Sequence, residues 1–125
     1  MYVIDNASIT PAGLTGLSHR TLAGSANGLR TLSVWSQTIE PGAATPPHRH
    51  DCEEVVVVGA GRGELHIDGS VQPFGPDCTI VLPANVEHQI VNSGDEPLKI
   101  VAALSMTPVQ VHLPDGSPLP LPWSS

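Results

Sequence analysis

Residues 42–61 carry two histidines and a glutamate at even-numbered positions, followed at once by four consecutive valines. Side chains of a β-strand alternate between its two faces. A strand through this stretch therefore directs His48, His50 and Glu54 to one face and the neighbouring Glu53 to the other. The valines indicate that the same strand runs into a core. The stretch favours a β-fold that gathers two imidazoles and a carboxylate on one side of a strand.

A second segment, residues 83–92, contributes a further histidine. Val86 and Ile90 share the strand parity of His88, so this histidine faces apolar neighbours and needs a polar partner. Three neutral imidazoles and one carboxylate form a suitable ligand set for a divalent transition metal. The simpler interpretations are a solvated strand end for the first three residues and a partly buried, otherwise satisfied histidine for His88.

Turn-forming residues divide the chain into short segments. Glycine and proline account for 25 of the 125 residues (12 and 13), which suits short strands joined by tight turns. Alternating apolar residues predict strands at 2–4, 20–22, 30–39, 50–58, 64–68, 79–82, 86–91, 98–106 and 109–113. Asp68-Gly69 is a two-residue hairpin signal. No helical periodicity, repeat or linker is visible, which favours one all-β domain, either a closed antiparallel barrel or a double-sheet jelly roll.

Two motifs in these segments resemble those of the cupin family. The first cupin motif, G(X)5HXH(X)3,4E(X)6G, is met at every fixed position by residues 42–61. The second, G(X)5PXG(X)2H(X)3N, is met in register by Pro83, His88 and Asn92. The chain is therefore similar to cupins over residues 42–92.

Two positions depart from the second motif. Asp77 and Asn85 stand where cupins have glycine. Asparagine adopts positive φ more readily than most residues, so Asn85 is a mild replacement for a turn glycine. We interpret Asn92, the last residue of the motif, as a turn or supporting group and not as a metal ligand.

The resemblance implies an all-β antiparallel barrel or jelly roll, the double-stranded β-helix of cupins, with one domain over residues 1–125. Its motifs lie at 42–61 and at about 77–92. It also implies a homodimer, as in most small cupins of this kind, and one divalent transition metal ion. The implied metal ligands are His48, His50, Glu54 and His88. This ligand set leaves the choice among Fe, Mn, Ni, Zn, Co and Cu open.

Such a site suits three functions. An ion with four protein ligands keeps positions open, so it can bind substrate and dioxygen side by side, polarise a carbonyl or ionise water. The first hypothesis is a non-haem dioxygenase acting on a small organic molecule. The second is a non-redox isomerase, lyase or decarboxylase, with Glu53, Gln37 and Cys52 as the candidate bases. The third is a cupin that binds a small ligand without turnover. Catalytic residues stay unassigned, because a one-residue slip exchanges the two faces of a strand.

The charge balance excludes several partners. The net charge is −7 with only five basic residues, too few for a patch that binds nucleic acid or an anionic membrane. No apolar run approaches the roughly 18–20 residues of a membrane span, and the first residues lack the pattern of a signal peptide. We therefore expect a cytoplasmic protein, with Cys52 and Cys78 as free thiols.

The remaining histidines and the C-terminus carry weaker signals. We interpret His19, His66 and His112 as ordinary surface histidines. The proline-rich tail, residues 114–125, has four prolines in its first nine residues and is expected to be extended outside any sheet. Trp123 is expected either to pack across a partner subunit or to fold over its own barrel.

Overall fold

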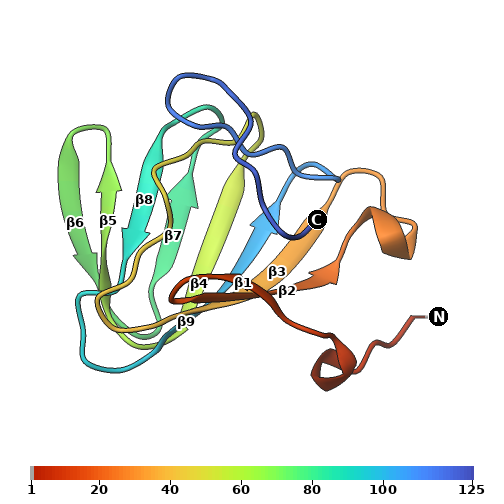
Figure 1. Ribbon diagram of the computed structural model, residues 1–125, viewed down its shortest axis with the longest axis horizontal. Helices are drawn as coiled ribbons and strands as arrows, with labels where there is room; N and C mark the ends of the chain where they lie inside the picture. Colours follow the sequence, from red (N-terminus) through yellow and green to blue (C-terminus); the bar gives the residue numbers. More distant parts are fainter. Residues whose placement is uncertain (1) are drawn as a thin grey trace.

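Nine short strands form the scaffold of residues 2–125, the part of the chain that the computed structural model describes (Figure 1). The strands are β1 (Ala12–Leu14), β2 (Leu17–Ala23), β3 (Ser33–Ile39), β4 (Glu54–Ala60), β5 (Gly63–Ile67), β6 (Ser70–Phe74), β7 (Thr79–Leu82), β8 (His88–Val91) and β9 (Leu98–Leu104). The helices in this part of the chain are two single 3-10 turns, Asn6–Ser8 and Ser25–Asn27. Neither is long and apolar enough to cross a membrane.

The strands form two antiparallel sheets. The larger sheet has the order β1-β2-β3-β9-β4-β7, and the smaller has the order β6-β5-β8. Aliphatic side chains on the inner faces form the core. In β4, Val56 and Val58 are buried while Val55 and Val57 face outward, and β9 repeats this alternation along its length. The expected all-β jelly-roll architecture is confirmed.

The segment that carries the first two histidines is not a regular strand. The strand predicted at 50–58 begins only at Glu54. Two prolines just ahead of the histidines have no backbone N–H, which prevents a continuous ladder. The segment nevertheless lies antiparallel beside the second motif, because His48 and His88 exchange both backbone hydrogen bonds, at 3.1 and 2.9 Å. Main-chain pairing thereby joins the two halves of the site.

Two other predicted strands are wrong. Residues 2–4 are exposed and pair with no strand of the described chain. Residues 109–113 contribute only isolated bridges, in which His112 pairs with Arg49 and with Pro118. The latter segment lies between prolines at both ends, which lack the donor that a longer ladder needs.

Left-handed backbone conformations occur at the turns that the sequence marks. Asp68 and Gly69 have φ of 52° and 72°, which suits a type I′ turn, and the β5-β6 hairpin is confirmed. Asp77 and Asn85 have φ of 61° and 63°. Both therefore adopt the conformation for which cupins use glycine. At Gly61, φ is +85° and an added Cβ would lie 2.7 Å from a backbone oxygen, so this position requires glycine.

The C-terminal segment, residues 107–125, folds back across one end of the barrel (Figure 1), and the C-terminal residue Ser125 lies beside β2. Arg49 and His112 exchange backbone hydrogen bonds of 2.9 Å in both directions. The Leu119 N–H donates to the Val111 carbonyl at 3.0 Å. Of the two arrangements expected for the tail, the structure shows the one in which it covers its own barrel.

Candidate metal centre

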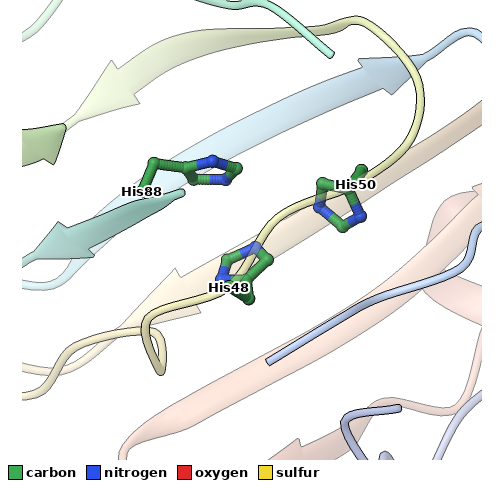
Figure 2. A group of neighbouring side chains, drawn as sticks. All are labelled: His48, His50 and His88. Atoms are coloured by element: carbon green, nitrogen blue, oxygen red, sulfur yellow. The ribbon is translucent and has the colours of Figure 1, made fainter. Parts of the chain in front are cut away.

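His48, His50 and His88 form a cluster inside the barrel. Ring nitrogens of the three residues lie within 4.8 Å of one another, and the rings gather around a common space (Figure 2). His48 and His50 come from the segment before β4, and His88 is the first residue of β8. His50 and His88 are each 3% exposed. The structure therefore brings together three of the four predicted ligands from two distant parts of the sequence.

Hydrogen bonds set the orientation of each ring. In all three histidines Nδ1 lies within hydrogen-bonding distance of a backbone carbonyl oxygen, and a neutral ring donates its proton there. The acceptors are Pro46 for His48 at 2.6 Å, Gln110 for His50 at 3.0 Å, and Val86 for His88 at 3.0 Å. The Nε2 lone pairs are then left free to face the shared space. Such backbone acceptors behind the rings are typical of metal-binding histidines.

Glu54 lies against this cluster. Its Oε1 atom is 3.5 Å from His50 Nε2 and 3.4 Å from His88 Nε2, too far for good hydrogen bonds. Both Oε1 of Glu54 and Nε2 of His50 are buried without a hydrogen-bond partner. Leaving such atoms unpaired is costly, whereas a divalent cation between them would satisfy both. The four side chains therefore fit a metal ion.

The protonation state of the histidines also suits metal binding. The pKa of His48 is lowered from 6.5 to about 4, mainly by burial and in part by the neighbouring His88. Burial likewise lowers the pKa of His50, although Glu54 and Gln110 act against this shift. Both rings are therefore neutral at pH 7, which is the form that binds a metal.

Asn92 supports the site from outside it. Its side chain is 1% exposed, and Nδ2 donates to the carbonyl oxygens of Ile39 at 2.8 Å and Glu96 at 2.9 Å. Its Oδ1 accepts a hydrogen bond from the Gly94 N–H at 2.9 Å. The side-chain amide of Asn92, the last residue of the second motif, is thus engaged in hydrogen bonds to backbone groups of neighbouring segments. This is the role expected of a supporting group.

A largely apolar cavity lies above the histidines. Its polar lining beyond the three histidines and Glu54 is Gln37 and Thr45. The main apolar walls are Leu17, Trp35, Ile100, Leu119, Leu121 and Trp123. The last three belong to the tail, which therefore closes the cavity. About 40 Å³ of this partly open cavity is accessible to water, room for a few water molecules. A larger ligand needs the tail or its side chains to move.

Gln37 of the cavity wall is one of the candidate bases named from the sequence, whereas Trp35 is not assigned to the site by the sequence alone. Trp35 and Gln37 are two residues apart in β3, so strand alternation places both side chains on the same face. Whether that face points into the barrel can be predicted only when the strand register is known. The prediction that His19 is an ordinary surface histidine is wrong. The residue is 1% exposed and stacks on Trp123, with ring centroids 4.1 Å apart and an angle of 7° between the planes. No local pattern predicts this contact. His66 and His112 are partly exposed, as expected.

The two cysteines are free thiols, as expected. Cys52 is 7% exposed and belongs to the aliphatic core, while Cys78 is half-buried. Burial raises the pKa of the Cys52 thiol, and the nearby Glu54 acts in the same direction. Cys52 does not line the cavity. It is therefore a protonated core residue and does not serve as a base in this site.

The two antiparallel sheets and the two motifs define the protein as a cupin. Residues 3–124 match the family described as "Auxin binding protein". The chain belongs to this auxin-binding protein family. It is 40% identical to auxin-binding protein T85 from Nicotiana tabacum over 120 residues, which cover 86% of this chain and 64% of that relative. The chain thus spans about 64% of the length of this relative.

Solved structures show the same fold. A cupin-superfamily sugar phosphate isomerase from Silicibacter pomeroyi has a TM-score of 0.74 at 26% identity, covering 94% of this chain and 96% of that structure. The polyketide cyclase RemF from Streptomyces resistomycificus also has a TM-score of 0.74, at 21% identity, covering 87% of this chain and 83% of that structure. Proteins with different named activities therefore share this barrel.

Proposed function

We propose that the protein holds one divalent transition metal ion, one of Fe, Mn, Ni, Zn, Co or Cu, and uses it to bind a small apolar organic acid. The proposed ligands are His48, His50, Glu54 and His88. The observation that carries the proposal is the pair of buried, unpartnered atoms, His50 Nε2 and Glu54 Oε1, at the floor of an apolar cavity. When bound, the ion would supply the positive charge that attracts an anionic oxygen.

The walls of the cavity support an acid with an apolar body. The side chains that line it include no lysine or arginine, so the only strong attraction for a carboxylate is the proposed ion. Trp35 and Trp123 provide flat surfaces for an aromatic or aliphatic body. Relatives named as auxin-binding proteins agree with this class, because auxins are small aromatic carboxylic acids.

Elemental analysis joined to calorimetry tests the proposal. We expect about one metal ion per wild-type chain and none in His50→Ala. Binding of indole-3-acetic acid is expected for the wild type and lost both in His50→Ala and after metal removal. His66→Ala is the matched control, because His66 is 40% exposed and outside the cluster, and it should keep both metal and ligand. A His50→Ala variant that retains a full metal load would contradict the assigned ligands.

A non-haem dioxygenase of small organic substrates is the second candidate function. Among the lining residues, no titratable side chain remains beyond the four proposed ligands. A non-redox isomerase, lyase or decarboxylase normally needs such a group as an acid or a base, whereas oxygen chemistry would come from the ion itself. Oxygen uptake by the Fe(II)-loaded protein with enol, diketone, thiol or catechol substrates tests this candidate. Anaerobic turnover with Zn(II) would favour the non-redox enzymes instead.

The remaining expectations from the sequence stay predictions. They are a single domain over residues 1–125, a cytoplasmic location and a homodimer. They do not affect the proposed site, whose ligands all come from one chain.

A further inference from the structure

Asn85 occupies the turn position at which the second cupin motif has glycine. Its φ is 63°, a left-handed conformation that glycine adopts without steric cost. The backbone of the turn therefore does not explain why asparagine stands here. Asn85 is exposed, so packing in the core does not explain it either. Its side chain must serve another contact.

That contact is with Arg49. The Nη1 atom of Arg49 donates a hydrogen bond to Oδ1 of Asn85 at 3.1 Å. Within residues 2–125, Arg49 forms no salt bridge, so its guanidinium is engaged with a neutral amide. The backbone of Arg49 is itself anchored, because it exchanges two hydrogen bonds with His112. A glycine at position 85 would offer no acceptor to this arginine.

The main chain at Asn85 connects the two segments that carry the histidines. The Asn85 N–H donates to the carbonyl oxygen of His50 at 2.6 Å. The next residue, Val86, supplies the carbonyl oxygen that accepts from Nδ1 of His88 at 3.0 Å. The conformation of this turn therefore determines how the ring of His88 faces the space that it shares with the other two histidines (Figure 2).

We propose that Arg49 and Asn85 are positioning residues, whose hydrogen bond holds the turn that orients the ring of His88. A charged donor makes this bond stronger than one between neutral groups. With Nδ1 of His88 bound to the Val86 carbonyl, Nε2 is the nitrogen left to face the cluster. For metal binding, the inference rests on the proposed function, in which His88 is a ligand.

The sign of the effect separates positioning from simple charge repulsion. Arg49 places a positive charge next to two proposed ligands of a cation. If its charge alone mattered, removing it would strengthen metal binding. If Arg49 acts by positioning, removing it weakens metal binding, because a ligand ring loses its fixed orientation.

Competition with a chelator for Zn(II) measures this effect in the full chain. Arg49→Met keeps the aliphatic stem, and Asn85→Gly keeps the turn conformation and the N–H that bonds to His50. Each variant should raise the metal dissociation constant about tenfold. The double variant should be no weaker than either single one, since all three remove the same hydrogen bond. Arg62→Met is the matched control: this exposed arginine lies beside Gly94, outside the site, and its loss should leave the constant unchanged.

Nitrogen NMR of the metal-free protein gives a second measurement. In the wild type, the ring of His88 should carry its proton on Nδ1 alone. Both Arg49→Met and Asn85→Gly should show a mixture of the two neutral tautomers. Asn85→Asp should restore the wild-type signal, because it keeps an acceptor for Arg49 and tolerates the left-handed conformation. A contact that contributed only to stability would leave the tautomer of the folded protein unchanged.

The two measurements distinguish this inference from the proposed function. A wild type that binds no metal, but whose His88 tautomer changes in both variants, would end the metal proposal and support the positioning role. Unchanged tautomer and unchanged affinity in both variants would overturn the positioning role and leave the metal site intact. Tighter metal binding by Arg49→Met would also overturn it. Circular dichroism reports folding, and if Arg49→Met does not fold, Asn85→Gly decides.

Discussion

His19 shows how one buried side chain holds two parts of this cupin together. Its Nε2 lies 2.9 Å from the Thr21 hydroxyl and 3.1 Å from the Ser125 hydroxyl. On the other side of the ring, Nδ1 lies 3.1 Å from the Gln37 amide nitrogen, which donates to it. The face of the ring stacks on Trp123. At the residue scale, His19 therefore fixes both the tail and one polar wall of the cavity.

Replacing His19 by alanine should destabilise the protein and release the tail. We expect the free energy of unfolding to fall by about 2–3 kcal/mol, because a buried ring and several hydrogen bonds are lost. Trp123 should become more exposed, which shifts its fluorescence to longer wavelength. His66→Ala, at a half-exposed site, should change stability by less than about 0.5 kcal/mol. Denaturant unfolding followed by tryptophan fluorescence measures both effects, and equal stability of the two variants would contradict this role.

The C-terminal segment acts as a structural element although it contains no strand. It supplies the Gln110 carbonyl that orients His50, and further along it supplies the apolar side chains that close the cavity. These two contributions come from different parts of the segment. At the element scale, orientation of a proposed metal ligand and closure of the cavity can therefore be separated.

Deletion of residues 119–125 should weaken ligand binding but spare the metal. The deletion removes Leu119, Leu121 and Trp123 from the cavity wall, whereas the backbone pair of Arg49 and His112 still anchors the segment that carries Gln110. We expect the affinity for indole-3-acetic acid to fall at least about tenfold through lost apolar contact, while one metal ion per chain is retained. Calorimetry and elemental analysis measure the two quantities. Simultaneous loss of metal and ligand would show that the two contributions are not separable.

Buried neutral histidines tie the stability of the whole molecule to pH. The pKa of His19 and that of His48 are both lowered from 6.5 to about 4 by burial. Below pH 6.5 the unfolded chain takes up protons at these residues, whereas the folded protein does so only near pH 4. The free energy of unfolding therefore decreases when the pH is low enough to protonate these rings in the unfolded chain.

The metal-free protein should lose stability as the pH falls from 6.5 toward 4. A shift of this size at His19 alone corresponds to roughly 3 kcal/mol. Above pH 6.5 both states hold neutral rings, so these groups should cause no further change. Denaturant unfolding at a series of pH values in the presence of a chelator measures the slope. His19→Ala should show a shallower slope than the wild type, and identical slopes would argue against a neutral buried His19.

Local patterns were enough to predict the all-β fold, the three even-numbered residues His48, His50 and Glu54, and the Asp68-Gly69 hairpin. Strand alternation and turn geometry act over a few residues, so they can be read directly from neighbouring positions. His88 was found because a second motif accompanies it. The predicted strand begins at residue 50, whereas β4 begins at Glu54. Residues 50–53 continue the alternating sequence pattern, but their backbone does not belong to a strand.

Contacts between distant parts of the chain were decided only by the tertiary structure. His50 and Gln110 are 60 residues apart, and His19 and Ser125 are 106 apart. No short-range periodicity links such positions. They meet because the sheets bring β2, the ligand segment and the C-terminal segment to one end of the barrel. The sequence by itself determined which side chains we propose as metal ligands. Packing between distant segments determined how backbone carbonyls orient the histidine rings and how the tail covers the cavity, because neither contact depends on neighbouring positions in the chain.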